Sequence, residues 1–167
     1  MTKEVPLTQG KFALVDDEDY ERVMMYKWYA SKTTSRLRLI RNKWYAERKE
    51  GKKTVYLHRF ILDAESGEEC DHRNGNGFDE RRCNLRIVTH QQNNWNRQKT
   101  TSRLGIPASS KYKGVHWRKD RNKWRARINI NCKRIHLGTF DSEEEAARAY
   151  DDKAIELHGE YAKINIG

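Results

Sequence analysis

An acidic residue, a histidine and two asparagines stand within 23 residues of one another in the middle of this 167-residue chain. Asp71 and His72 are adjacent, Asn84 lies twelve residues beyond His72, and Asn93 lies nine residues beyond Asn84. Carboxylate and amide oxygens suit a hard cation such as Mg²⁺, and an imidazole beside them suits a general base. The four residues therefore predict a metal-assisted catalytic centre.

The segments around these residues are predicted to form a hairpin followed by a helix. Residues 69–77 contain a Gly/Asn turn, and a short strand is expected within residues 83–89. Thr89 then has the pattern of an N-cap, with Gln92 three residues later as its capping-box partner. This order lets the four residues converge where the hairpin and the helix meet.

The composition of the chain favours an anionic partner. The formal net charge is +10 and the sequence pI is about 9.6, while hydrophobic residues make up 36% and charged residues 35%. Such proportions indicate several small cores rather than a single large one. A membrane is excluded as the partner because there is no run of about 18 apolar residues and no basic amphipathic helix. Nucleic acid is the leading anion.

The three cysteines do not indicate a zinc or disulfide site. Cys70, Cys83 and Cys132 are odd in number and form no Cys-x-x-Cys pair. Cys70 and Cys83 flank the hairpin, and two half-buried thiols in a reducing compartment are the favoured interpretation. The first residues lack the apolar stretch of a signal peptide. We therefore expect a cytoplasmic protein, in a bacterium or a phage-infected host.

Residues 1–56 are predicted to form a small β-rich region. A strand is expected at residues 11–15 and a helix at residues 16–25, where acidic residues complement the N-terminal end of the helix dipole. Three alternating strands are then expected at residues 36–40, 44–48 and 54–57. This sheet either contacts DNA or braces the hairpin, and bracing is favoured.

The C-terminal part alternates after a linker at residues 98–110, which is rich in polar and basic residues. Strands are expected at residues 114–118, 123–129 and 133–137, followed by a helix with a Ser142–Glu145 capping box. Alternation places one set of side chains on the core face: Val115, Trp117, Trp124, Ala126, Ile128, Ile135 and Leu137. The other face carries His116, Arg118, Arg125, Arg127, Arg134 and His136.

Charge separates sharply between this sheet and its helix. Residues 111–134 hold ten Lys or Arg and the single acid Asp120, whereas residues 141–160 hold eight acids and only two basic residues. A surface that was merely soluble would mix the two signs. The open face of the sheet is therefore predicted to bind the anion, and a sheet of this size fits the major groove of DNA.

Residues 58–96 resemble the HNH nuclease family, in the His-Asn-Asn variety of phage and intron-encoded homing endonucleases. The resemblance is carried by Asp71-His72, Asn84-Leu85-Arg86 and Gln92-Asn93 at matching spacings. It implies a ββα-metal fold that holds one divalent cation, Mg²⁺ or Mn²⁺. As a hypothesis, His72 activates the attacking water, Asp71 and Asn93 hold the ion, and Asn84 pins the loop that orients His72. Products with 5′-phosphate and 3′-hydroxyl ends are implied as well.

Residues 112–166 are similar to the plant ethylene-response-factor (APETALA-type) DNA-binding domain. The similarity is carried by residues 112–115, 124–126, 137–140 and 145–151. It implies a three-stranded sheet in the major groove with a helix behind it. The DNA-binding residues are then expected to be Lys113, His116, Arg118, Arg125, Arg127, Arg134 and His136.

Several positions depart from these families or leave alternatives open. Glu80 stands where related nucleases usually have Asn, and Cys132 stands where a Gly is expected in a tight turn. His116 and His136 replace an Arg and a Trp of the plant relatives, so sequence preference does not transfer. Asn94 or Asn96 could replace Asn93 as the metal ligand. His58 is interpreted as a packed or hydrogen-bonding residue in preference to a ligand.

The sequence thus predicts an α+β protein in four parts. These are a β-rich region (1–56), an HNH module (57–97), a linker (98–110) and a three-stranded antiparallel sheet on one helix (111–167). The predicted function is a site-directed DNA endonuclease of the homing type that nicks double-stranded DNA as a monomer. Two alternatives are a transcription-factor-like DNA-binding protein with an inert nuclease module, and an RNA-binding protein or ribonuclease.

Overall fold

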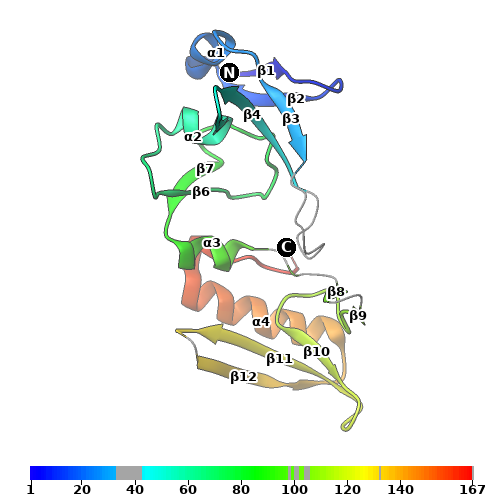
Figure 1. The fold of residues 1–167 in the computed structure, drawn as a ribbon. Coiled ribbons are helices and arrows are strands. Elements are labelled where there is room, and N and C mark those ends of the chain that lie inside the picture. Colours follow the sequence, from blue (N-terminus) through cyan, green and yellow to red (C-terminus); the bar gives the residue numbers. More distant parts are fainter. Residues whose placement is uncertain (33–42, 98, 100–101, 104–105, 132, 167) are drawn as a thin grey trace. The chain divides into compact units, whose positions relative to one another are not determined.

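The computed structural model describes residues 1–32, 43–97, 99, 102–103, 106–131 and 133–166 (Figure 1). The chain divides into two compact units, Met1–Asn93 and Asn94–Gly167, and each is described by itself. Among the helices that the structure describes, none is long and apolar enough to cross a membrane.

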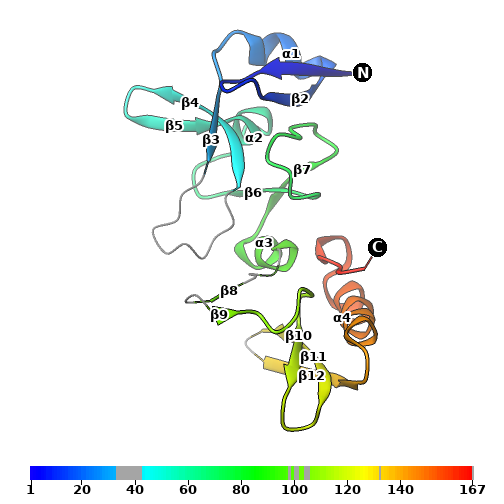
Figure 2. The same ribbon diagram turned by 90° about the vertical axis from the view of Figure 1, so that its right-hand side faces the viewer.

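The first unit contains three small antiparallel sheets and short helices (Figures 1 and 2). In chain order its elements are β1 (Thr2–Pro6), β2 (Phe12–Asp16), α1 (Asp17–Met24), β3 (Tyr29–Lys32), β4 (Trp44–Glu50), β5 (Lys53–Tyr56), α2 (Leu57–Ile61), β6 (Glu69–His72) and β7 (Leu85–Val88). The sheets are β1-β2, β3-β4-β5 and β6-β7. Helix α3 (His90–Asn96) ends the first unit along the chain and begins the second.

The predicted N-terminal elements are confirmed in part. Strand β2 and helix α1 occur where alternation and the acidic start placed them, but the prediction missed β1. Strands β4 and β5 match the second and third strands of the predicted meander. The strand expected at residues 36–40 lies outside the described residues, and the structure pairs β4 with β3 at Tyr29–Lys32 instead.

The hairpin and the start of α3 match the sequence pattern. In β6-β7, Asp71 pairs with Arg86 and His72 pairs with Leu85. Gln92 accepts hydrogen bonds from the Thr89 backbone N–H at 2.9 Å and from the Thr89 hydroxyl at 3.1 Å, and its own backbone N–H donates to that hydroxyl. The capping box therefore starts α3 as predicted.

One apolar core joins the N-terminal strands to the nuclease-like hairpin. It runs through Val5, Leu7, Ala13, Val15, Val23, Trp28, Ala30, Ala46, Leu57, Ile61 and Leu85. Its largest member, Trp28, is buried and donates its indole N–H to the Val23 carbonyl at 2.9 Å, so its polar atom is satisfied. The boundary predicted between residues 56 and 57 lies inside this shared core.

The second unit is a three-stranded antiparallel sheet covered on one face by a helix (Figures 1 and 2). It contains β8 (Ser102–Arg103), β9 (Ile106–Pro107), β10 (Val115–Arg118), β11 (Lys123–Ile130), β12 (Lys133–Phe140), α4 (Glu143–His158) and a 3₁₀ turn at Gly159–Tyr161. The sheet order is β10-β11-β12. The short β8-β9 pair lies in the segment predicted to be a linker.

The faces predicted for this sheet are confirmed except at Trp117, which is half-buried and packs edge to face on Trp124. Val115, Ala126 and Ile128 are buried against Ala146, Ala147, Tyr150 and Ala154 of α4, and the small side chains of the three alanines allow close approach. The hydroxyl of Ser142 accepts hydrogen bonds from the backbone N–H groups of Glu144 and Glu145, which confirms the N-cap. Strand β12 continues to Phe140, three residues beyond its predicted end. Cys132 is outside the described residues.

Gly114 is required at the entry to β10. Its φ is +79°, and a Cβ there would lie 2.0 Å from Cδ2 of Tyr150 and 2.7 Å from the Arg127 carbonyl oxygen. Tyr150 is itself buried in the core. Only a residue without a side chain fits this backbone and this contact.

Candidate catalytic centre and nucleic-acid interface

The loop between β6 and β7 is closed by Asn84. Its side-chain oxygen accepts a hydrogen bond from the Asn74 backbone N–H at 3.0 Å, and its Nδ2 donates to the Asp79 carbonyl at 2.7 Å. The Asn84 carbonyl also accepts from the backbone N–H of Arg73 at 2.8 Å. Since Arg73 follows His72 directly, Asn84 fixes the chain that leads away from this histidine.

The same loop is held rigidly by Asp79. This buried carboxylate accepts from Arg81 Nε at 2.7 Å and from Asn74 Nδ2 at 2.8 Å. The hydrogen bond from Arg81 is the main reason that the pKa of Asp79 lies below its ordinary value. A Cβ on Gly77 would lie 2.1 Å from the Trp44 carbonyl oxygen, so the loop also packs tightly against β4.

Strand β2 fixes the position of Glu80 by backbone pairing. The Leu14 N–H donates to the Phe78 carbonyl at 2.8 Å, and the Glu80 N–H donates to the Leu14 carbonyl at 2.9 Å. These two bonds form a parallel bridge between Leu14 and Asp79. The residue that faces His72 is therefore placed by a strand of the N-terminal region.

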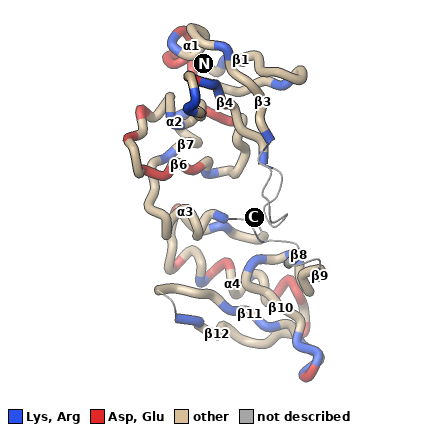
Figure 3. Tube along the Cα trace, viewed as in Figure 1, with Lys and Arg blue, Asp and Glu red and all other residues tan. Residues whose placement is uncertain are grey.

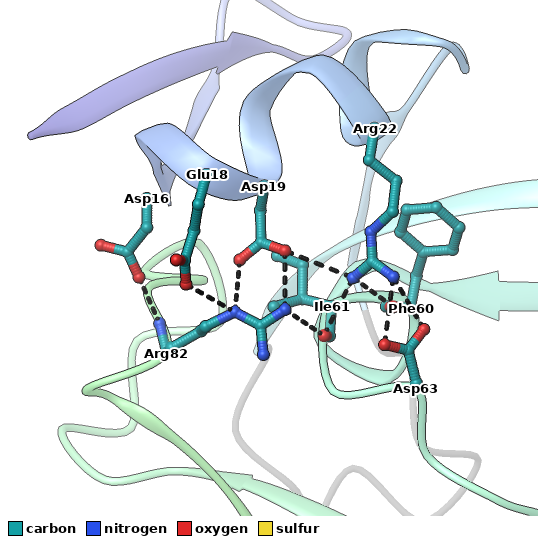
Figure 4. A network of polar contacts seen from close by, with 8 residues as sticks. All are labelled: Asp16, Glu18, Asp19, Arg22, Phe60, Ile61, Asp63 and Arg82. Atoms are coloured by element: carbon teal, nitrogen blue, oxygen red, sulfur yellow. Dashed lines mark hydrogen bonds and ion pairs between the residues drawn. The ribbon is translucent and has the colours of Figure 1, made fainter.

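Helices α1 and α2 hold the end of the loop through Arg82 (Figure 4). Its guanidinium donates to both oxygens of Asp19, at 2.7 and 2.8 Å, and to the Ile61 carbonyl at 3.1 Å. Its backbone N–H donates to Asp16 at 2.8 Å. Hydrogen bonding to Asp19 raises the pKa of Arg82. Asp16 and Asp19 of the N-terminal region thus hold this end of the loop in place.

A second arginine joins the same helices (Figure 4). Arg22 of α1 donates to both oxygens of Asp63 at 2.8 and 3.0 Å, and to the carbonyls of Phe60 and Ile61 at 3.2 and 3.0 Å. These carbonyls belong to the C-terminal end of α2, where a cation is favourable. Arg22 and Arg82 together hold α2, which carries His58, against α1.

Two histidines and a glutamate meet beside this loop. His58 of α2, His72 of β6 and Glu80 of the loop each offer one ligand atom, and these atoms lie within 4.8 Å of one another. His72 Nε2 lies 3.2 Å from Glu80 Oε2, and the two imidazole rings meet edge to face with centroids 5.0 Å apart. Glu80 is 0%, His72 6% and His58 8% exposed. Solvent therefore has little access to the three side chains of this cluster.

Burial sets the charge state of this cluster. It raises the pKa of Glu80, and the hydrogen bond with His72 opposes that rise. Burial, followed by the nearby His72, lowers the pKa of His58 to about 3, so His58 is neutral at physiological pH. Burial also raises the pKa of Tyr45, whose ring lies 5.8 Å from His58 and 6.0 Å from His72.

The two predicted metal ligands have separate partners in this structure. Asp71 Oδ2 accepts from Arg86 Nε at 3.1 Å and Nη2 at 2.8 Å in a buried ion pair. Asn93 Nδ2 donates to Glu69 at 2.7 Å. The structure thus joins His72 and Asn84 through one loop, while Asp71 and Asn93 take their contacts from Arg86 and Glu69.

The sequence does not predict the cluster partners of His72. Its pattern favours a packed role for His58, and Glu80 is only a departure from the nuclease pattern. The one signal available was the presence of a carboxylate at position 80, where related nucleases usually have an amide. Among the described residues, His58, His72 and Glu80 offer N, N, O donors that could hold a cation, and this set is distinct from the predicted oxygen donors of Asp71 and Asn93.

The open face of the β10-β11-β12 sheet forms a basic hollow. Its lining is Arg118, Arg121, Arg125, Arg127, Arg134, His136 and Thr139. In register, Arg125 pairs with His116 and Arg127 pairs with His136, so basic side chains adjoin across the strands. Burial, then the neighbouring Arg134, lowers the pKa of Arg127. Crowded guanidinium groups of this kind favour a bound anion.

Two of the residues predicted to bind DNA differ from the rest. Burial lowers the pKa of His116 to about 4, so this half-buried imidazole is neutral at pH 7. Lys113 does not line the hollow: its ammonium donates to the Trp95 carbonyl at 2.5 Å, near the C-terminal end of α3. Burial lowers the pKa of Lys113 to about 8. Lys113 therefore caps a helix in this structure.

The two cysteines that the structure describes are free thiols. Cys70 is half-buried, whereas Cys83 is exposed rather than half-buried. Burial raises the pKa of Cys70, which makes it a weak nucleophile at neutral pH.

Comparison with known proteins identifies both parts of the chain. The AP2 domain model matches residues 110–160. An uncharacterized HNH endonuclease of Acanthamoeba polyphaga mimivirus is 26% identical over 159 residues, which covers 94% of this chain and 76% of the viral protein. Protein 3.8 of Escherichia phage T7 is 31% identical over 98 residues, which covers 59% of this chain and 76% of that protein.

Plant proteins match the C-terminal part. Ethylene-responsive transcription factor ERF024 of Arabidopsis thaliana is 48% identical over 57 residues, or 33% of this chain and 31% of the plant protein. The chain is thus a homologue of HNH endonucleases with a C-terminal AP2 domain, and both resemblances drawn from the sequence are confirmed. It belongs to the protein family that includes Protein 3.8 of phage T7.

Proposed function

We propose that this protein is a metal-dependent endonuclease that cuts duplex DNA with its hairpin and selects the site with its C-terminal sheet. The observation that carries the proposal is the placement of His72, at the end of β6, next to a buried carboxylate and beside a loop pinned by Asn84. The homology to HNH endonucleases and the AP2 domain support the substrate class.

In this mechanism His72 is the general base. It takes a proton from the water that attacks the scissile phosphorus, a new P–O bond forms, and the bond to the 3′-oxygen breaks. The products carry 5′-phosphate and 3′-hydroxyl ends. Glu80 accepts a hydrogen bond from the Nε2–H of His72, which holds the ring and stabilises the imidazolium that forms. Asn84 is a positioning residue that keeps the loop and His72 in place.

A divalent cation, Mg²⁺ or Mn²⁺, fits the oxygen donors of Asp71 and Asn93 by chemistry. When bound there, it would polarise a non-bridging phosphate oxygen and stabilise the leaving oxygen. Arg86 competes for Asp71 and Glu69 holds the Asn93 amide, so we expect weak binding of the cation in the absence of DNA.

DNA recognition is assigned to the basic hollow. Six residues of the open face are proposed to contact the major groove: His116, Arg118, Arg125, Arg127, Arg134 and His136. The arginines there bind guanine edges or phosphates, because a planar guanidinium group can donate two parallel hydrogen bonds to either. Lys113 is left out because the Trp95 carbonyl engages its ammonium.

Each segment of the chain is assigned its own role. Residues 57–97 act as the ββα-metal module, residues 1–56 brace it, and residues 98–110 connect it to the DNA-binding part. One metal centre cuts one strand, so a monomer would nick. We place the enzyme inside the cell, as a site-directed enzyme of the homing type.

The test is nicking of supercoiled plasmid by the full-length protein with Mg²⁺, with and without EDTA. His72→Ala should bind DNA as the wild type does and nick about 10²- to 10⁴-fold more slowly, because general-base catalysis is lost. His90→Ala is the matched control, since His90 is exposed on α3. Equal nicking by His72→Ala would refute the assigned base.

The alternative of an inert nuclease module predicts a different outcome. The protein would then shift a duplex probe in a gel yet leave plasmid intact at every Mg²⁺ and Mn²⁺ concentration. A randomised duplex library incubated with the protein and Mg²⁺ would show the cut ends, the number of strands cut and any site preference. Stronger competition by duplex RNA than by duplex DNA would favour the RNA-binding alternative.

A further inference from the structure

Two polar atoms of the His72 cluster have no hydrogen-bond partner within the described part of the chain. They are Nδ1 of His58 and Oε1 of Glu80, and both are buried. A buried polar atom without a partner costs about 1–3 kcal/mol, so such atoms call for an explanation. Both belong to side chains that are more than nine-tenths buried and that face the same histidine.

The three side chains have the composition of a transition-metal site. Two imidazoles and one carboxylate, with an open fourth position, form the ligand set of many zinc centres. Their ligand atoms lie within 4.8 Å of one another. Donors around a tetrahedral zinc ion are roughly 3.3 Å apart, given bonds of about 2.0–2.1 Å. Small side-chain rotations would therefore close the set around an ion.

We propose that His58, His72 and Glu80 form a second cation site, selective for a borderline-soft ion such as Zn²⁺ over Mg²⁺. The choice of ion follows from the donors, because Mg²⁺ prefers oxygen ligands and keeps several waters, whereas imidazole suits Zn²⁺. His58 is well suited to a ligand role because its buried Nδ1 has no hydrogen-bond partner among the described residues.

An ion at this site would switch the enzyme off. A metal-bound His72 cannot accept the proton of the attacking water, because the ion occupies one ring nitrogen and withdraws charge from the ring. Its ligand atoms differ from the Asp71 and Asn93 oxygens that are proposed to hold the catalytic ion, so the two sites are separate. This consequence rests on the proposed function, whereas binding of the ion does not.

The first experiment measures binding alone. The full-length protein is stripped with a chelator and titrated with Zn²⁺ by calorimetry, and separately with Co²⁺ by visible absorption, which reports a tetrahedral site. One ion per chain is expected, with the intense visible bands of tetrahedral cobalt. Glu80→Gln and His58→Gln should each weaken Zn²⁺ binding by more than about tenfold, since each removes a ligand.

Two control variants exclude other ligands. His90→Gln removes the exposed His90–Glu69 pair, whose atoms lie 2.7 Å apart, and Cys70→Ser with Cys83→Ser removes both described thiols. Both controls should bind Zn²⁺ as the wild type does. Circular dichroism shows whether Glu80→Gln and His58→Gln are folded, and Glu80→Asp, which keeps a carboxylate, should bind better than Glu80→Gln.

Three results would overturn the site. They are no Zn²⁺ binding by the wild type below about 1 mM, unchanged binding in folded Glu80→Gln and His58→Gln, or loss of binding in a control variant instead. The second experiment adds Zn²⁺ to the Mg²⁺-dependent nicking assay, where loss of activity that a chelator and fresh Mg²⁺ reverse is expected. If the protein does not nick DNA, the proposed function fails while the titration still decides the metal site.

Discussion

Arg82 and Asp19 are joined by two hydrogen bonds, of 2.7 and 2.8 Å, although 63 residues separate them in the chain. Asp19 is buried at the start of α1, and Arg82 lies in the loop that carries Glu80 (Figure 4). This ion pair joins the same two regions that share the apolar core, namely the N-terminal elements and the hairpin.

Removing Arg82 should therefore weaken both the fold and the loop between β6 and β7. Within the described part of the chain, Arg82→Ala leaves the buried Asp19 carboxylate with only the Arg22 contact at 3.3 Å, and we expect a loss of about 1–3 kcal/mol in the free energy of unfolding. Urea unfolding measures it. Arg118→Ala is the control, because its partner Asp120 is exposed, and it should change stability by less than about 0.5 kcal/mol. Equal losses in both variants would contradict a special role for Arg82.

The basic hollow predicts a salt-dependent change in DNA affinity. Arg125→Ala and Arg127→Ala should each weaken duplex binding by about 1–3 kcal/mol, and a residue that contacts phosphate should also lower the slope of log K against log salt by about one. Fluorescence anisotropy at several salt concentrations measures both. Lys153→Ala removes one positive charge from α4, where Lys153 pairs with Glu156, and should leave the affinity nearly unchanged.

Gly114→Ala should destabilise the second unit. The new Cβ would meet the Tyr150 ring at 2.0 Å on a backbone with φ of +79°, and neither the strand nor the buried ring can move away cheaply. Overpacking and backbone strain together predict a loss of about 2–4 kcal/mol. Gly159→Ala is the matched control: its φ is +52°, but nothing lies within 4 Å of the added atom. Thermal unfolding of the two variants should differ accordingly.

His116 predicts how the stability of the second unit depends on pH. Burial, together with Arg127, Lys99, Arg125 and Arg134, lowers the pKa of His116 from 6.5 to about 4 in the folded state. The unfolded chain then binds more protons between these two values, so the free energy of unfolding should fall as pH drops from about 6.5 to 4. In His116→Gln this part of the pH dependence should disappear, whereas His136→Gln, which alters an exposed ring, should retain it.

The sequence predicted those features whose physics is local. Alternation separates Val115 and Ala126 from Arg125 and Arg127 because side chains on a strand point to opposite faces. The caps formed by Thr89 and Ser142 involve residues at most three positions apart. These strand faces and helix caps could be predicted from the sequence without knowing which segments they pack against.

Features that depend on distant segments could not be predicted. The pairing of Leu14 with the Glu80 loop joins backbones through carbonyl and N–H groups that every residue has, so no side-chain pattern reveals it. The cluster of His58, His72 and Glu80 forms only once α2 and the loop are packed on the same core. Arg86 is part of the nuclease motif, but its bond to Asp71 depends on the cross-strand register of β6 and β7.

The bridge between Leu14 and Asp79 limits where recombination can divide this chain without disrupting its fold. Recombination can attach an AP2 domain to new partners, because residues 94–167 form a compact unit with their own core. A fragment that began at residue 57 would lack β2, α1 and most of the core, and its loop would have no strand to pair with. We therefore expect gene fusions to keep the first 93 residues together and to join the two parts after the hairpin.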